Sequence, residues 1–192
     1  MTPAVFLDRD GVLVEDADLL TRPEQLRLLP GVPGALNELS RGGFALVVVT
    51  NQPVVARGLA TVTQVEEVNR RLEELIRQAG GPALDGLYFC PHHPRATLPE
   101  WRADCKCRKP RPGLLLWAAR DLDLNLKACF MVGDRITDII AGARAGCLTA
   151  LVQTGKHLDK SIETSEPLDT SIRPDHLCAD LAAAAQWILK AK

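Results

Sequence analysis

The sequence has no excess of charge of one sign and no long hydrophobic run. Its 23 Lys and Arg residues are balanced by 24 Asp and Glu residues, which gives a formal net charge of −1. No overall positive field therefore favours a nucleic-acid partner. The longest apolar runs, such as residues 44–49, fall far below the roughly 20 residues that span a bilayer. We expect neither nucleic-acid binding nor membrane association.

The N-terminal region lacks the pattern of a secretory signal peptide. Residues 4–7 are apolar, but no basic segment precedes them and Asp8 follows directly. We therefore expect a cytoplasmic protein. The length of 192 residues fits one domain and leaves little room for a second core. We expect a single domain over residues 1–192, as a monomer or a small homo-oligomer.

Short apolar runs alternate with segments in which apolar residues have helical spacing. The runs that predict buried strands are residues 4–7, 45–49, 84–89, 129–132 and 148–152. Apolar residues three or four positions apart predict helices within residues 32–39, 65–76, 114–118, 136–143 and 181–189. This order predicts an α/β fold, a Rossmann-like three-layer sandwich with a mostly parallel central sheet. The active site is expected at the edge where the strands end.

Two stretches interrupt this alternation. Residues 90–107 hold three of the six cysteines, interleaved with histidines, and such clustering in a cytosolic protein indicates a metal rather than disulfides. Residues 154–174 are polar and have no periodic apolar face, so we expect a surface excursion there. No stretch between the motifs is long enough for a cap domain, and we expect an open pocket.

Acidic residues follow the first and fourth predicted strands. Asp8 and Asp10 stand two residues apart before Gly11, and Asp134 and Asp138 follow the fourth strand. Two acids at one strand end can divide the duties of nucleophile and proton donor. Taken alone, the first pair serves equally well as polar loop residues, and the second pair as helix caps or solvated charges.

Hydrogen-bond donors and a cation follow the other strands. Thr50, Asn51 and Gln52 end the second strand and are suited to donate hydrogen bonds to phosphate oxygens, although a turn or cap is the simpler reading of Thr50. Lys109 supplies a cation before the third helix. Together these residues place acids, a hydroxyl and a lysine at separate strand ends of one sheet edge, in an order that chance seldom produces.

In this order the chain resembles the haloacid dehalogenase superfamily of phosphotransferases, from residue 6 to about residue 152. The superfamily's four motifs are matched by Asp8 with Asp10, Thr50, Lys109, and Asp134 with Asp138. The resemblance implies covalent catalysis in which Asp8 attacks phosphorus to form an aspartyl phosphate. Asp10 is then implied to protonate the leaving oxygen and afterwards to activate water.

The resemblance also implies a Mg²⁺ cofactor. A carboxylate that approaches an anionic phosphoryl group is repelled, so the site needs positive charge. The implied protein ligands are Asp8, Asp134 and the backbone carbonyl of Asp10, with Asp138 behind or beside the ion. Lys109 is implied to neutralise the remaining charge, and its proximity is expected to lower the pKa of Asp8.

Four soft ligands in two close pairs predict a structural Zn²⁺ site. Cys90 and His92 form a Cys-x-His pair, and after twelve intervening residues Cys105 and Cys107 form a Cys-x-Cys pair. The alternative is a set of ordinary surface thiols with a loop histidine. Because Cys107 lies two residues before Lys109, zinc at this loop is expected to hold the lysine in place.

The zinc loop narrows the resemblance to a subgroup. Residues 89–94 and 105–113 are similar to those of the heptose 1,7-bisphosphate 7-phosphatase family, and histidinol-phosphate phosphatases share the ligands in a shorter loop. Residues 53–55 are Pro-Val-Val where the heptose family commonly has Ser-Gly-Ile, and Arg135 also occurs in the histidinol relatives. The longer loop favours a phosphosugar substrate that loses its 7-phosphate, a step in ADP- or GDP-heptose biosynthesis.

A second phosphate on such a substrate requires cations near the pocket. Arg57 and Arg108 are the candidates, because a guanidinium group binds phosphate through two parallel hydrogen bonds. Arg57 serves equally well as a solvated surface charge. Two alternatives stay open, a histidinol-phosphate phosphatase and a catalytically silent zinc-loop module that senses phosphate. The sequence does not distinguish the α from the β anomer.

Overall fold

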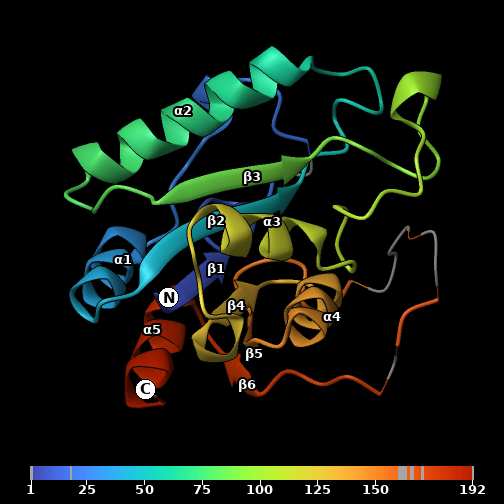
Figure 1. The fold of residues 1–192 in the computed structure, drawn as a ribbon. Coiled ribbons are helices and arrows are strands. Elements are labelled where there is room, and N and C mark those ends of the chain that lie inside the picture. The colour runs from blue at the N-terminus through green and yellow to red at the C-terminus, as the bar shows by residue number, and fades with distance from the viewer. Residues whose placement is uncertain (1, 18, 160–163, 165–166, 170, 192) are drawn as a thin grey trace.

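Six parallel strands form one sheet at the centre of the molecule (Figure 1). The computed structural model describes residues 2–17, 19–159, 164, 167–169 and 171–191. The strands are β1 (Ala4–Leu7), β2 (Ala45–Asn51), β3 (Gly86–Cys90), β4 (Phe130–Gly133), β5 (Leu148–Val152) and β6 (His176–Cys178). Their order across the sheet is β3-β2-β1-β4-β5-β6, and every neighbouring pair is parallel.

Helices cover both faces of this sheet. They are α1 (Val32–Arg41), α2 (Val62–Gln78), α3 (Gly113–Asp121), α4 (Ile136–Ala145) and α5 (Leu181–Lys190). Helices α1, α2 and α5 share one hydrophobic cluster with Leu7 and Val48, whereas α3 and α4 share another with Phe6 and Val47. Because successive strand residues point to opposite faces, these alternating contacts define three layers. The predicted three-layer α/β sandwich with a parallel sheet is confirmed.

The strand order brings the ends of β1 and β4 together. From β1 the chain builds β2 and β3 on one side, and then crosses to build β4, β5 and β6 on the other. The crevice at such a reversal is the usual ligand site of an open α/β sheet. Asp8 follows β1 and Asp134 follows β4, and the Asp8 N–H donates to Val132 O at 3.0 Å. The topology therefore places both acids side by side at the edge of the sheet where β1 and β4 end.

Several strands differ from the prediction. Strand β2 extends to Asn51 rather than residue 49, and β4 spans Phe130–Gly133 rather than residues 129–132. Strand β3 begins at Gly86 rather than residue 84, and β6 was not predicted because three residues carry too little pattern. The expected excursion at residues 154–174 lies partly outside the described residues. No cap domain is evident among the described ranges. None of the helices that the structure describes is long and apolar enough to cross a membrane.

Candidate functional site

Three buried carboxylates lie close together, and a buried ammonium group contacts two of them. Oxygens of Asp8, Asp134 and Asp138 lie within 4.8 Å of one another. The Nζ atom of Lys109 lies 3.1 Å from Asp8 Oδ1 and 2.7 Å from Asp138 Oδ1. Lys109 is only 2% exposed. Residues from the ends of three segments that are distant in the sequence thus form one charged cluster.

Backbone and amide groups hold this cluster in place. Asp8 Oδ1 accepts a hydrogen bond from the Arg9 N–H at 2.7 Å, and Asp138 Oδ2 accepts from the Arg135 N–H at the start of α4 at 3.0 Å. Lys109 Nζ donates to Val49 O at 2.8 Å. The Asn51 side chain donates to Lys109 O and accepts from Lys109 N, both at 3.1 Å. The end of β2 therefore fixes the lysine.

Burial and mutual repulsion raise the pKa values of the acids. Desolvation raises the pKa of Asp8, although Lys109 acts in the opposite direction. Burial, together with the charges of Asp138 and Asp8, raises the pKa of Asp134 to about 8. Burial alone lowers the pKa of Lys109, but Asp138 and Asp8 outweigh it and the net shift is upward. The expected effect of Lys109, which lowers the pKa of Asp8, is confirmed, but desolvation exceeds it and the net shift is upward.

The residues present fit a divalent cation. When ionised, three carboxylates at −1 each and one ammonium at +1 leave a charge of −2. Asp134 Oδ1 is buried and has no hydrogen-bond partner within the described part of the chain. Buried charges and polar atoms normally have partners. Carboxylate oxygens are the donors that Mg²⁺ prefers, so the donor set and the charge both suit this ion.

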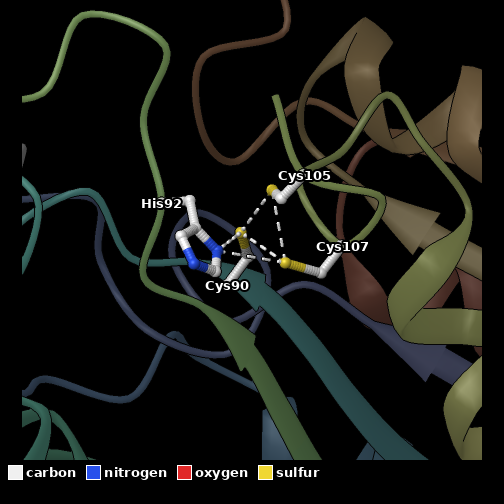
Figure 2. A group of neighbouring side chains, drawn as sticks. All are labelled: Cys90, His92, Cys105 and Cys107. Carbon is white, nitrogen blue, oxygen red and sulfur yellow. Dashed lines mark hydrogen bonds between the residues drawn. The ribbon is translucent and has the colours of Figure 1, made fainter. Parts of the chain in front are cut away.

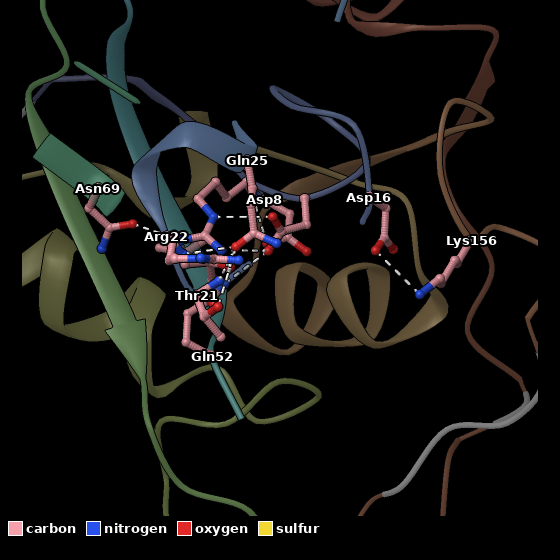
Figure 3. Close-up of polar contacts among 12 residues, drawn as sticks. Asp8, Asp16, Thr21, Arg22, Gln25, Gln52, Asn69 and Lys156 are labelled. Atoms are coloured by element: carbon pink, nitrogen blue, oxygen red, sulfur yellow. Dashed lines mark hydrogen bonds and ion pairs between the residues drawn. The ribbon is translucent and has the colours of Figure 1, made fainter. Parts of the chain in front are cut away.

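Asp10 lies beside this cluster and has separate partners. Its carboxylate accepts from Arg9 Nε at 3.2 Å and Arg9 NH2 at 3.0 Å, and from Gln52 Nε2 at 2.9 Å. Its side chain is 25% exposed, more than that of Asp8. Figure 3 shows Asp8, Gln52 and Asn69 around these contacts. Asp10 is therefore held firmly at the edge of the site that faces solvent.

A cavity of about 430 Å³ opens over the cluster. The buried residues in its lining include Asp8, Thr50 and Lys109. Its more exposed lining is rich in charge, with the cations Arg57, Arg108, Arg135 and Lys156 and the acids Asp16 and Asp159. Arg135 lies 3.7 Å from Asp16 and 3.4 Å from Asp159, and Lys156 lies 3.3 Å from Asp16. The outer lining therefore offers guanidinium and ammonium groups to an anionic ligand, and Asp16 and Asp159 neutralise part of their charge.

Two predicted substrate-binding amides have positioning contacts. Arg57, Arg108 and Asn51 line the cavity, but the Asn51 amide is engaged with the Lys109 backbone. Gln52 is only 2% exposed and is not part of the lining, and its Nε2 donates to Asp10 and to Thr50 Oγ1. These contacts indicate that both amides orient other site residues. Direct contact of either amide with substrate stays a prediction.

The loop after β5 also contributes to the site, although it was not among the predicted site residues. Thr154 Oγ1 donates to Gly11 O at 2.6 Å, and the Lys156 N–H donates to Asp134 Oδ2 at 2.7 Å. Gly155 packs so closely that a Cβ there would meet Asp134 Oδ2. These residues begin the stretch interpreted as a surface excursion. Their position at the end of a predicted strand was the available signal, since all such ends share one edge.

The four predicted zinc ligands converge at the end of β3 (Figure 2). Cys107 Sγ lies 2.9 Å from Cys90 Sγ and 3.3 Å from Cys105 Sγ, and His92 Nδ1 lies 3.5 Å from Cys107 Sγ. All three cysteines are free thiols. A tetrahedron with the usual zinc–sulfur bonds has edges of about 3.8 Å. The donors are therefore close to the arrangement that zinc needs.

The thiols of this cluster cannot all ionise without a cation. Cys105 accepts from its two neighbours, and these hydrogen bonds lower its pKa, while the bond to Cys105 raises the pKa of Cys107 to about 12. A bound metal replaces this competition by stabilising every thiolate. Three sulfurs and one imidazole nitrogen are the donor set of a structural zinc site. The cluster fits that ion.

The fold and the acid–lysine cluster define a haloacid-dehalogenase-like (HAD-like) hydrolase. The HAD-hydrolase-like family model matches residues 106–184. D-glycero-D-manno-heptose-1,7-bisphosphate 7-phosphatase from Thermosynechococcus vestitus is 40% identical over 97% of this chain and 95% of its own length. The D-glycero-beta-D-manno-heptose-1,7-bisphosphate 7-phosphatase of Escherichia coli K12 is 41% identical over 85% of each chain. The chain belongs to this family of heptose-bisphosphate phosphatases.

A solved structure agrees with this assignment. D,D-heptose 1,7-bisphosphate phosphatase from B. bronchiseptica, complexed with magnesium and phosphate, is similar with a TM-score of 0.82. The identity is 33%, and the match covers 99% of both chains. The similarity therefore extends over the whole fold.

Gly11 provides a direct test of the acid cluster. Its φ is +77°, and a Cβ there would lie 2.5 Å from Asp134 Oδ2. Gly31 has nearly the same φ, +78°, but its nearest neighbour would be 3.9 Å away. Gly11→Ala and Gly31→Ala should both lose about 1–2 kcal/mol from backbone strain, measured by denaturant unfolding. Only Gly11→Ala should also weaken Mg²⁺ binding, measured by calorimetry, and equal Mg²⁺ affinity in both variants would contradict the geometry.

The raised pKa of Asp134 predicts how stability depends on pH without Mg²⁺. Between the ordinary value of 3.8 and the folded value of about 8, the folded state binds more protons than the unfolded state. The contribution of Asp134 to the free energy of unfolding is therefore fully present below pH 4 and is lost as the pH rises toward 8. Mg²⁺ should raise the Tm more at pH 8 than at pH 5, because it binds the ionised form.

The control for this prediction is Asp134→Asn in Mg²⁺-free buffer without a chelator, so that zinc is retained. The variant should lose most of the Mg²⁺-dependent gain in Tm at pH 8, measured by differential scanning calorimetry. An equal gain in the variant and the parent would show that Asp134 does not bind the ion.

Proposed function

We propose that this protein is a phosphomonoesterase that removes the 7-phosphate of D-glycero-D-manno-heptose 1,7-bisphosphate. The sugar product keeps its 1-phosphate. The observation that carries this proposal is the position of Asp8, 3.1 Å from Lys109 and within 4.8 Å of Asp134, beneath a cavity whose lining includes Arg57 and Arg108. The names of the relatives that match most of the chain support the choice of substrate. The product is then available for heptose activation to an ADP or GDP sugar.

The first step transfers the phosphoryl group to Asp8. A carboxylate oxygen of Asp8 forms a bond to phosphorus as the bond from phosphorus to the sugar oxygen breaks. The electron pair of the broken bond stays on the sugar oxygen, and the proton of Asp10 moves to that oxygen. The products of this step are an aspartyl phosphate, an alcohol and ionised Asp10.

The second step releases inorganic phosphate. Asp10 accepts a proton from water while the water oxygen attacks phosphorus. The bond between phosphorus and the Asp8 oxygen breaks and its electron pair returns to the carboxylate. Asp10 ends protonated and Asp8 ends ionised, so the site is ready for another substrate molecule.

Charge compensation lets Asp8 act as a nucleophile. Burial raises its pKa and so opposes the ionised form, whereas Lys109 favours that form. Asp8, Asp134 and Asp138 would hold Mg²⁺, with the Asp10 carbonyl as a proposed fourth protein ligand. The ion supplies positive charge that screens repulsion between the carboxylate and the phosphate.

The remaining predicted residues receive the substrate. Thr50 Oγ1 accepts from Gln52 at 3.0 Å, which leaves its hydroxyl proton to donate to a phosphate oxygen. Arg57 and Arg108 line the cavity and bind the second phosphate of the substrate. Because no cap covers the cavity among the described residues, these loop residues determine substrate choice.

A bound Zn²⁺ at Cys90, His92, Cys105 and Cys107 is the second part of the proposal. No coordination position remains for substrate when four protein ligands bind, so the zinc is structural. The Gly113 N–H donates to Lys106 O at 3.1 Å, and Arg108 NH1 donates to His92 O at 3.2 Å. The segment that leads into Lys109 is therefore tied to the ligand loop.

Phosphate release from both anomers of the heptose bisphosphate tests the proposed activity. Mg²⁺ should be required, and kcat/KM for at least one anomer should greatly exceed that for histidinol phosphate. Asp8→Asn keeps the shape of the side chain but removes the nucleophile, and should lower kcat by roughly a thousandfold or more. Acid quenching of the parent should recover phosphorylated protein that hydroxylamine dephosphorylates.

The matched control is Glu67→Gln, which removes one exposed carboxylate from α2 and should retain full activity. Comparable kcat/KM values for histidinol phosphate would contradict the proposed specificity. Full activity of Asp8→Asn would contradict covalent catalysis, and no phosphate release from any phosphomonoester would favour a phosphate-sensing module.

Metal analysis tests the zinc proposal. The purified protein should contain about one zinc ion per chain, measured by inductively coupled plasma mass spectrometry. Cys105→Ser should lose this zinc, and activity should fall roughly 10- to 100-fold as Lys109 loses its support. Cys147→Ser changes a buried thiol outside the cluster and should keep the zinc. Full zinc content in Cys105→Ser would contradict the assignment.

A further inference from the structure

Arg9 is a buried cation that no step of the proposed mechanism uses. It stands between Asp8 and Asp10 in the sequence and is 0% exposed, the largest fully buried side chain. A guanidinium group in the interior costs much free energy unless it is paired and hydrogen-bonded. Among the residues that the structure describes, its side-chain hydrogen bonds go to Asp10 and Asn69. The buried charge is therefore directed at the carboxyl that transfers protons.

The contact between Arg9 and Asp10 has two points. Arg9 Nε donates to Asp10 Oδ1 at 3.2 Å and Arg9 NH2 donates to Asp10 Oδ2 at 3.0 Å. Two parallel hydrogen bonds from a planar guanidinium fix the plane of a carboxylate as well as its position. Gln52 Nε2 adds a third donor to Oδ2 at 2.9 Å. Rotation of the Asp10 carboxyl is thereby restricted from two sides.

Asn69 holds the other end of Arg9. Arg9 NH1 donates to Asn69 Oδ1 at 2.9 Å (Figure 3). Asn69 is 5% exposed on the core-facing side of α2, among Val65, Val68 and Leu72. Its Nδ2 is buried without a hydrogen-bond partner in the part of the chain that the structure describes. A polar residue with an unpaired donor on an apolar helix face lowers stability, which indicates a function for its oxygen.

We propose that Arg9, anchored to α2 by Asn69, is a positioning residue that aims the Asp10 carboxyl at the oxygen of the leaving group. The proposal rests on the proposed function, in which Asp10 protonates that oxygen as the bond to phosphorus breaks. Proton transfer in the transition state requires the acid within hydrogen-bond distance of the oxygen, and small displacements reduce the rate strongly. The Arg9 side chain transfers no proton itself and acts on the reaction through its contact with Asp10.

The choice of leaving group separates this role from a merely structural one. An alkoxide such as that of a sugar phosphate needs a proton when it leaves, whereas p-nitrophenolate leaves without one. Loss of the acid's orientation should lower kcat/KM for the sugar phosphate much more than for p-nitrophenyl phosphate. Because kcat/KM reports only the steps through transfer to Asp8, the later hydrolysis of the aspartyl phosphate does not obscure the comparison.

The experiment measures the ratio of kcat/KM for the heptose bisphosphate to that for p-nitrophenyl phosphate. Arg9→Lys keeps the charge but loses the two-point contact, and Asn69→Leu removes the anchor while suiting the apolar face. Both should lower the ratio roughly 10- to 100-fold. Asn69→Asp retains an oxygen that accepts from Arg9, so its ratio should be close to that of the parent. Leu72→Ala, on the same helix face, should lower stability and leave the ratio unchanged.

Asp10→Ala distinguishes failure of this inference from failure of the proposed function. A lowered ratio in Asp10→Ala with an unchanged ratio in Arg9→Lys and Asn69→Leu would overturn the role of Arg9 alone. An unchanged ratio in Asp10→Ala would overturn the role of Asp10 as the acid, and with it this inference. Should Arg9→Lys fail to fold, the Asn69→Leu and Asn69→Asp pair decides.

Discussion

The site depends on the incomplete compensation of buried negative charge. Three carboxylates meet at the ends of two neighbouring strands, and the ammonium group of Lys109 is the cation in contact with two of them. The acids repel one another and are poorly solvated, which is why the pKa of Asp134 is raised to about 8. Such an arrangement is unfavourable by itself. It becomes favourable with a divalent cation, and the same cation lets a carboxylate approach a phosphoryl group.

Contacts with neighbouring segments hold the cluster together although its carboxylates repel one another. The Asn51 amide donates to the Lys109 carbonyl and accepts from the Lys109 N–H, and the side chain of Arg108, the residue before Lys109, donates to His92 O in the cysteine loop. The loop after β5 donates a backbone N–H to Asp134. Small residues such as Gly11 allow these segments to approach. Rigid support of this kind keeps charged groups in the geometry of the reaction, and sites without it lose activity.

The lining of the cavity above the cluster carries charges of both signs. Its cations are partly neutralised, since Arg135 and Lys156 form ion pairs with Asp16 and Asp159. The net charge of the lining is therefore modest, and recognition of a substrate with two phosphates depends on where guanidinium groups stand rather than on a strong overall field. The open cavity leaves this selection to loops instead of a separate domain.

The sequence by itself determined the α/β layers and the residue types of the acid cluster and of the cysteine–histidine cluster. Alternating strand and helix patterns predict the sheet, and Cys90, His92, Cys105 and Cys107 come together because their spacing is local. The tertiary structure alone decided which side chains face the substrate and which support others. Gln52, Arg9 and Asn69 carry no local signal for their contacts, which join a strand end, the loop after β1 and a helix. The tertiary structure also decided the net upward shift of the Asp8 pKa. Desolvation causes this shift, and it depends on how many segments cover a group rather than on the group's neighbours in the sequence.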